Sequence, residues 1–216
     1  GLGGKVDAVS VDGVLDRELP LAHVRIRHTA VETPLPVGMW RSVSHSQNGF
    51  FKESFMDELA HAAGRDPYES RRQLLAGTRQ AAVLDLAAMK AGWGQPLPEG
   101  HARGIAIVAS YGSIVAQVVE LSKEGDGPRV HRVVCAVDCG VAIDPYNIAA
   151  QMESGVVYGL SAALWGEITL KGGAVEQQNF HQYRVLRINE MPRVETWLVS
   201  SSEAPGGIGE CAVPPI

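Results

Sequence analysis

The chain has 216 residues, of which 45% are hydrophobic and 20% charged, and this composition is ordinary for a globular protein with a sizeable core. A net charge of −5 without a basic cluster argues against nucleic acid as a partner, because phosphates must be met by concentrated Lys and Arg. No apolar run approaches the length of a membrane span, and residues 1–10 lack the basic and apolar parts of a signal peptide. We therefore expect neither a membrane span nor a targeting segment.

The three cysteines are an odd number and do not indicate a disulfide framework. Cys135 and Cys139 form a C-x₃-C pair, but they lie in or beside an apolar run with no third and fourth ligand nearby. We expect both to be small buried hydrophobic residues, and we predict no metal site built from side chains.

The first regular pattern covers residues 21–33, where apolar and polar residues alternate with the period of a half-buried strand. Val24 and Ile26 would face one way, and the prolines at 34 and 36 would end the strand.

Residues 48–63 are predicted to form an amphipathic helix that ends at Gly64. Phe51, Phe55 and Leu59 recur at i, i+4 and i+8, which predicts that this stripe lies in the core.

Two further helices are expected. Asp66 followed by Pro67 is typical of a capped helix start, which predicts a helix over 67–76. The next helix should run from Arg79 to Ala91 and end at Gly92, with Val83, Leu84, Ala87 and Ala88 facing inward.

The pattern changes to β after the Pro/Gly linker at 95–100, with strands expected at 104–110, 115–121 and 129–137. The last two would be joined as a hairpin through Glu124-Gly125-Asp126-Gly127-Pro128. We therefore divide the chain into a strand plus a helical block over 1–94 and an α+β part over 95–216.

A long apolar helix is expected from Asp144-Pro145 to Trp165. Gly155 and Gly159 inside it weaken a helix, so they should allow close approach to a neighbouring backbone or to a ligand. Gln151 would point into this crowded region, where it could contact a ligand or cap another segment. A hairpin around Lys171-Gly172-Gly173 and a strand over 194–199 complete the pattern, which favours an α+β fold over a doubly wound parallel sheet.

The last stretch, residues 202–216 (the tail), contains Gly206, Gly207 and Gly209 just before Glu210. Glycines let the backbone adopt positive φ and approach something bulky, and a carboxylate held on such a loop is a candidate general base. The alternative is a surface turn with a solvated Glu.

Four stretches together resemble one family. They are VGMWRSVSHSQNGFFKESFMDELAHAAGRDPYESRRQLL, VDCGVAIDPYNIAAQMESGVVYGLSAALWGEITL, NFHQYRVLRINEMP and PGGIGECAVPPI. In order and spacing they are similar to the carboxy-terminal part of the molybdenum-cofactor-binding large subunit of the xanthine dehydrogenase and aldehyde oxidase family, in the branch that contains the beta subunit of isoquinoline 1-oxidoreductase.

The resemblance implies the fold and the activity. The fold would be the carboxy-terminal portion of the molybdenum-cofactor-binding α+β domain, here incomplete. The activity would be hydroxylation of an aldehyde or an N-heteroaromatic substrate, with water as the source of the oxygen and Glu210 as the catalytic base. The molybdenum would be held by a pterin, either molybdopterin or its cytosine dinucleotide, and not by side chains.

The resemblance also assigns cofactor-binding roles to Arg41, Gln151 and the glycines Gly206, Gly207 and Gly209. The chain departs from the family in two places. Ser42 to His45 follow Arg41, where the family has small residues with a glycine first, and Ser154 stands at the first glycine of the family's Q-x-E-G-G. His45 and Gln47 would either line the pocket or pack within the loop.

The partners implied are the missing amino-terminal part of the large subunit and a separate small subunit, whose iron-sulfur clusters accept the electrons. The three cysteines cannot supply a four-cysteine cluster. The resemblance points to a bacterial protein and leaves both cytoplasm and periplasm open. The competing hypothesis is that the chain is a non-catalytic structural or assembly piece that contributes half of a molybdenum-cofactor interface and exposes an apolar surface where the other half docks.

Overall fold

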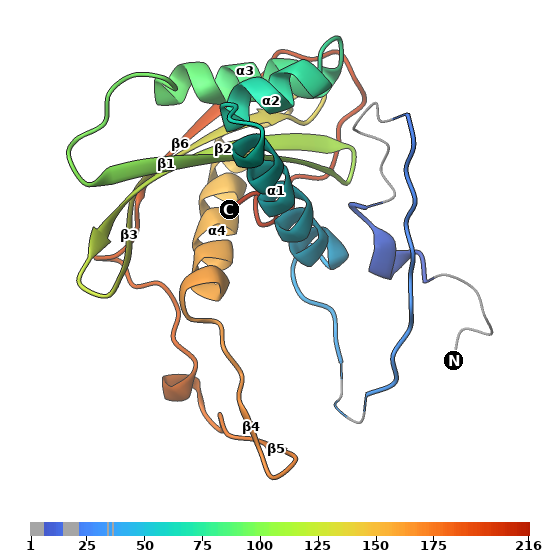
Figure 1. Cartoon of the computed structure of the whole chain (residues 1–216), viewed down its shortest axis with the longest axis vertical. Coiled ribbons are helices and arrows are strands. Elements are labelled where there is room, and N and C mark those ends of the chain that lie inside the picture. Colours follow the sequence, from blue (N-terminus) through green and yellow to red (C-terminus); the bar gives the residue numbers. More distant parts are fainter. Residues whose placement is uncertain (1–6, 15–21, 34, 36) are drawn as a thin grey trace.

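A four-stranded sheet in the order β1-β2-β3-β6 forms the centre of the computed structural model, which describes residues 7–14, 22–33, 35 and 37–216 (Figure 1). Strands β1 (His101–Ser110), β2 (Ser113–Glu124) and β3 (Gly127–Asp138) are antiparallel, and β6 (Arg193–Leu198) joins β3 in parallel. The first half of β2 and the second half of β3 are buried on both faces, which explains their largely apolar sequences.

One face of the sheet is covered by α3 (Arg79–Ala91), which lies next to α2 (Pro67–Leu74). Val83, Leu84 and Ala87 of α3 are fully buried against the sheet. The helix ends at Gly92, whose left-handed φ of +66° closes the last turn. The predicted inward face and both ends of this helix are confirmed.

The other face is covered by α4 (Pro145–Trp165), together with the tail after Glu210. A Cβ atom at Gly155 would lie 2.6 Å from the Cβ of Ala212, and one at Gly159 would lie 2.0 Å from Cγ2 of Ile216. The predicted close approach at these glycines is therefore confirmed, and the neighbour is the chain's own tail. Gln117 of β2 holds the tail from the side of the sheet, because its Nε2 donates to the Ala212 carbonyl at 2.9 Å.

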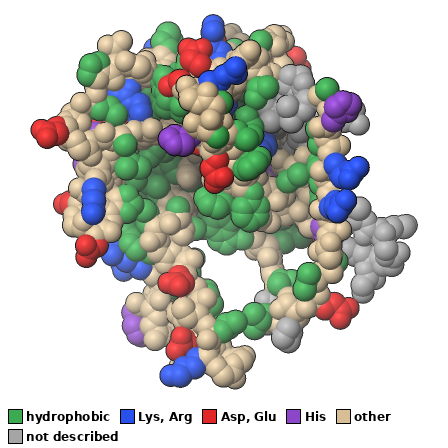
Figure 2. All heavy atoms as spheres, viewed as in Figure 1, with side chains coloured by type: hydrophobic (Ala, Val, Ile, Leu, Met, Phe, Trp, Pro, Cys, Tyr) green, Lys and Arg blue, Asp and Glu red, His purple; other side chains and the backbone are tan. Residues whose placement is uncertain are grey.

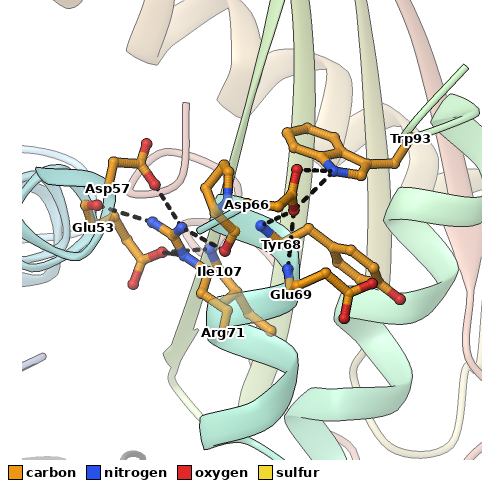
Figure 3. A network of polar contacts seen from close by, with 9 residues as sticks. Glu53, Asp57, Asp66, Tyr68, Glu69, Arg71, Trp93 and Ile107 are labelled. Carbon is orange, nitrogen blue, oxygen red and sulfur yellow. Dashed lines mark hydrogen bonds and ion pairs between the residues drawn. The ribbon is translucent and has the colours of Figure 1, made fainter. Parts of the chain in front are cut away.

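Helix α1 (Ser44–Ala62) is joined to the rest of the body by a buried ion cluster (Figure 3). Arg71 of α2 donates from Nε to Oε2 of Glu53 at 2.8 Å, and the N–H of Ile107 in β1 donates to the same oxygen at 3.1 Å. Arg71 also pairs with Asp57 and donates to the Glu53 carbonyl. One arginine therefore connects α1 and α2, and Glu53 connects both to β1.

Two expectations were wrong. Described residues 22–33 form no strand and are exposed over their whole length, so their alternation does not reflect burial against a sheet. Phe51, Phe55 and Leu59 are 62%, 57% and 47% exposed. Helix α1 instead buries a small and polar stripe, made up of Ser44, His45, Gly49, Glu53 and Ala60.

The remaining predicted elements are confirmed with shifted ends. Helix α1 begins four residues earlier than expected, and the hairpin at 171–173 is formed by β4 (Leu170–Lys171) and β5 (Ala174–Val175). Short 3₁₀ turns η1 and η2 occur at Val9–Val11 and Phe180–Gln182. Cys135 and Cys139 are buried free thiols. Across the described residues, none of the helices combines the length and apolar character needed to span a bilayer.

We expect Arg71→Met to lower the free energy of unfolding by about 3–5 kcal/mol, because it leaves the buried Glu53 carboxylate without its charged partner. Urea unfolding followed by circular dichroism measures the loss. The matched control is Arg72→Met, which removes an ion pair with Asp85 whose side chains are 53% and 42% exposed. This control should leave the urea midpoint unchanged. Equal losses in the two variants would contradict the weight given to burial.

Candidate functional site

The tail reaches the site after being fixed by two turns at the edge of the sheet. The N–H of Gly206 donates to the Cys139 carbonyl at 2.9 Å, and that of Gly207 donates to the Tyr111 carbonyl at 2.8 Å. A Cβ atom at Gly206 would lie 2.5 Å from Oγ of Ser113, and one at Gly207 would lie 3.0 Å from Cβ of Tyr111. These two glycines therefore let the tail backbone pack against the β1–β2 turn.

The turn after β3 is held by the buried carboxylate of Asp138. Arg79 of α3 donates from Nε to its Oδ2 at 2.9 Å, and the N–H of Gly140 donates to its Oδ1 at 3.0 Å. Burial raises the pKa of Asp138, but these two donors outweigh burial and hold the pKa below its usual value. Gly140 has a φ of +70°, and a Cβ there would lie 2.2 Å from the Ala204 carbonyl oxygen. The charged anchor therefore sets the path of the tail on this side.

Arg41 lies between the tail and α4 and bridges them. Its Nε donates to the Gly209 carbonyl at 2.8 Å, and its Nη2 donates to Oε1 of Gln151 at 3.3 Å and to Oγ of Ser154 at 3.0 Å. Its guanidinium carbon lies 5.6 Å from the ring centroid of Tyr158. These contacts place the Arg41 guanidinium beside the glycine that precedes Glu210.

Glu210 is half-buried where the tail meets the loop before α1. The backbone N–H of Ser42 donates to its Oε1 at 3.4 Å, and the Ser42 hydroxyl donates to its carbonyl oxygen. Burial, followed by the nearby Glu210 carboxylate, raises the pKa of the Tyr111 phenol to about 12. Ser42 and Val43 have φ values of +74° and +45°, a conformation that is costly for residues other than glycine. This conformation explains why a glycine suits the position that Ser42 occupies.

A groove of about 610 Å³ opens beside Arg41. It lies between α4 and two segments that extend away from the sheet in Figure 1, residues 37–43 before α1 and residues 166–192 after α4. In Figure 2, hydrophobic side chains are gathered directly above the opening between these two segments. The lining is mainly aromatic and aliphatic and includes Trp40, Val157, Tyr158, Tyr183, Leu186 and Met191. Polar groups are few, and Arg41, Glu153 and Ser154 lie along the side formed by α4 and the loop before α1. The groove therefore fits a small, largely apolar molecule.

The structure brings together four of the six residues singled out in the sequence, namely Arg41, Gln151, Gly209 and Glu210. Gly206 and Gly207 precede these residues in the tail and pack against the β1–β2 turn. His45 and Gln47 do not line the groove beside Arg41. His45 is buried with its ring 5.0 Å from that of Tyr111, and Gln47 is exposed.

Sequence reasoning assigned no role to two residues that the structure places at the site, namely Ser42 and Ser154. Ser42 and Ser154 stood out only as departures from glycines of the family, yet the Ser154 hydroxyl accepts from Arg41.

The donors at this site suit an anionic, oxygen-rich group. Gln151 accepts from Arg41 through Oε1, which leaves its amide nitrogen as a donor, and Arg41 uses Nε and Nη2 for the contacts above, which leaves its Nη1 as a charged donor. Within the described residues no three His, Cys, Asp or Glu side chains are grouped as metal ligands.

Comparison with known proteins gives a family match over most of the chain. The model of the molybdopterin cofactor-binding domain matches residues 42–192, a range that contains Gln151 but neither Arg41 nor the tail. The beta subunit of isoquinoline 1-oxidoreductase from Brevundimonas diminuta is 31% identical over 93% of this chain and 26% of its own length.

Two further relatives are 30% identical to this chain. The membrane-bound aldehyde dehydrogenase (pyrroloquinoline-quinone) of Gluconacetobacter polyoxogenes matches 86% of this chain and 27% of its own length. The B subunit of nicotinate dehydrogenase from Pseudomonas putida matches 85% of this chain and 17% of its own length. The chain therefore spans about a quarter or less of the length of these relatives.

Among solved structures, the aldehyde oxidoreductase from Desulfovibrio desulfuricans superposes with a TM-score of 0.65 over 82% of this chain and 38% of that chain. The sequence identity is 11%, so this likeness concerns the fold. It agrees with the predicted α+β architecture of a molybdenum-cofactor-binding domain.

We expect Asp138→Asn to lower the free energy of unfolding at neutral pH by about 2 kcal/mol, because it removes the charge that Arg79 and Gly140 stabilise. The folded pKa of Asp138 lies below its unfolded value of about 3.9, so its contribution is fully present above about pH 4. It is lost as the pH falls through the folded pKa. The free energy of unfolding, measured at a series of acid pH values, should therefore change less with pH in the variant than in the unaltered chain.

The matched control for this series is Asp126→Asn, which lies exposed in the β2–β3 turn. It should reproduce the pH dependence of the unaltered chain. An unchanged acid slope in Asp138→Asn would contradict the role given to Asp138.

Proposed function

Because the chain belongs to the molybdopterin cofactor-binding domains of the xanthine dehydrogenase and aldehyde oxidase family, we propose that it is part of a molybdenum hydroxylase. The reaction is the oxidative hydroxylation of an aldehyde or an N-heteroaromatic compound, with the oxygen derived from water. Relatives named for isoquinoline, aldehyde and nicotinate support this substrate range.

The observation that carries the proposal is the convergence of Arg41, Gln151 and Glu210 from three distant parts of the chain. Arg41 donates to the carbonyl of Gly209, the residue before Glu210, and to the side chain of Gln151. A solvated surface turn, the alternative raised for the tail, would not need a buried Ser42 or an arginine with three acceptors. The arrangement is that of a binding site with one carboxylate at its edge.

Arg41 and the Gln151 amide bind and orient the anionic and carbonyl groups of a molybdenum–pterin cofactor. When bound, this cofactor supplies the two-electron oxidation of the substrate carbon. Glu210 accepts, at a carboxylate oxygen, the proton of the water-derived oxygen as that oxygen attacks the carbon. The apolar groove beside Arg41 holds the aromatic or aliphatic body of the substrate and excludes water.

The complete enzyme needs further polypeptide. Two of the relatives are themselves named as subunits, one as a beta subunit and one as a B subunit, which supports assembly with other chains. We propose that one of these chains carries iron-sulfur clusters and accepts the electrons, and that the remaining length of a large subunit completes the cofactor site. The cofactor itself is molybdopterin or its cytosine dinucleotide.

A second candidate function is that this chain contributes structure and half of the cofactor interface without catalysis of its own. The observation that favours it is the exposed apolar stripe of α1, in which Phe50, Phe51, Phe55 and Leu59 are each 47% exposed or more. Contiguous apolar surface of this kind marks an interaction site. The partner for this stripe is the rest of the cofactor-binding subunit.

Glu210→Gln in the complete enzyme should lower kcat by about 10²–10⁴-fold, because glutamine keeps the shape of the side chain but cannot accept the proton. Molybdenum and pterin contents should stay at the level of the unaltered enzyme, since Arg41 and Gln151 are unchanged. Steady-state kinetics and metal analysis measure the two quantities.

The matched control is Glu203→Gln, an exposed carboxylate on the same tail. It should leave kcat unchanged. Near-normal turnover by Glu210→Gln with full molybdenum would contradict catalysis by this residue.

For the second candidate, we expect Phe51→Ser with Phe55→Ser to abolish most of the self-association and hydrophobic-dye binding of the isolated 216-residue chain. Analytical ultracentrifugation and dye fluorescence measure both properties. The control is Phe180→Ser, because Phe180 is 94% exposed on η2, far along the chain from this stripe. A monomeric chain that binds no dye before any substitution would contradict the docking role of α1.

A further inference from the structure

Arg41 and Ser42 are neighbours in sequence, and they bind two carbonyls that are also neighbours in sequence. The Arg41 guanidinium donates from Nε to the Gly209 carbonyl at 2.8 Å. The Ser42 hydroxyl donates to the Glu210 carbonyl, and the N–H of Ser42 donates to Oε1 of Glu210 at 3.4 Å. The peptide groups on both sides of the Glu210 Cα atom are therefore held by two adjacent residues of the loop before α1.

The backbone that carries these two donors is strained. Ser42 and Val43 have φ values of +74° and +45°, which residues with a Cβ atom seldom adopt, and β-branched residues least of all. Successive side chains of an extended segment point to opposite sides, so an extended backbone would turn one of the two donors away from the tail. The left-handed conformation at Ser42 breaks this alternation, and the side chains of Arg41 and Ser42 both meet the tail.

Backbone hydrogen bonds keep the loop in this conformation. The N–H of Val43 donates to the Trp40 carbonyl at 2.8 Å, and the N–H of His45 donates to the Ser42 carbonyl at 3.0 Å. Ser42 itself is completely buried. A glycine would adopt the same backbone without strain, so the hydroxyl is what a serine adds at this position. Strain of this kind persists where the surroundings hold it, and it gathers at functional sites.

We infer that Ser42 is a positioning residue that fixes the backbone of Glu210 and thereby the direction of its carboxylate. The inference rests on the proposed role of Glu210 as the base. A base must lie within hydrogen-bonding distance of the proton that it accepts, and a small displacement lowers the rate. Ser42 does not line the groove beside Arg41, so it acts through Glu210 alone.

The first test needs no cofactor, because the Glu210 carbonyl also accepts from the N–H of Val213, at 3.1 Å. Ser42→Ala removes the hydroxyl and keeps the backbone N–H. In the 216-residue chain, amide hydrogen exchange at Val213, followed by nuclear magnetic resonance, should become about tenfold faster, because the tail opens more readily with one anchor fewer. An unchanged exchange rate would overturn the inference.

The matched control is Ser44→Ala at the start of α1. Ser44 is also buried, and its hydroxyl forms none of the contacts with the tail described above. This variant should leave the exchange rate of Val213 and the kinetics of the complete enzyme unchanged. An equal acceleration of exchange in Ser44→Ala would show a general loosening of the loop, and it would overturn the specific role of Ser42.

The second test uses the complete enzyme loaded with its cofactor. Ser42→Ala and Ser42→Gly should each lower kcat about tenfold and keep KM and the molybdenum content, since both lack the hydroxyl. Their stabilities should differ, because glycine relieves the strain at positive φ and alanine does not. Ser42→Gly should therefore combine the higher urea midpoint with the same low kcat. A kcat that recovers in Ser42→Gly, or a raised KM with unaltered kcat, would overturn the inference.

The two claims fail separately. Full turnover by Glu210→Gln would contradict the proposed function, while the exchange rate of Val213 would still report whether Ser42 holds the tail. Full turnover by both Ser42 variants, beside a loss of turnover in Glu210→Gln, would overturn the role of Ser42 and leave the proposed function standing.

Discussion

The path of the carboxy-terminal tail under α4 is the constraint on which the rest of the site depends. A side chain at position 155 or 159 would collide with Ala212 or Ile216. Because both positions are glycines, the tail can pack against α4 and enter the core. Once residues 211–215 are buried between α4 and the sheet, Glu210 must lie at the rim of the core. Its position is thus a consequence of how the residues after it pack.

Charged and polar anchors then set the fine geometry. Asp138, held by Arg79, orders the turn that receives the tail backbone, and Arg41 holds the tail at Gly209. The Glu53–Arg71 cluster fixes α1, and α1 in turn fixes the strained loop at Ser42 whose N–H reaches Glu210. Local strain at Ser42, Val43 and Tyr111 is therefore supported by interactions formed elsewhere in the fold.

Sequence patterns predicted most of the fold because local signals and the fold agree for α3, α4 and the β1–β3 meander. Asp144 with Pro145 and Gly92 are capping signals that need no tertiary information. The stripe of Phe51, Phe55 and Leu59 misled because periodicity identifies an apolar face but not what covers it. The alternation over 21–33 misled because a strand needs a partner edge, which no local pattern supplies.

The site was predicted in part for the same reason. Arg41, Gln151 and Glu210 came from recognised motifs, and the structure brings them together. Their roles toward a cofactor stay a prediction. Ser154 could not be found in this way, because its importance arises from direction and distance across separate elements: its hydroxyl lies 3.0 Å from Nη2 of Arg41.

The most direct test of the account is to locate molybdenum by anomalous X-ray scattering in crystals of the complete cofactor-loaded enzyme. The account predicts one molybdenum peak beside the Glu210 carboxylate, on the side of Arg41 and Gln151, with the apolar groove leading to it. A molybdenum peak on the opposite face of the sheet, next to α2 and α3, with Glu210 directed into solvent, would contradict it.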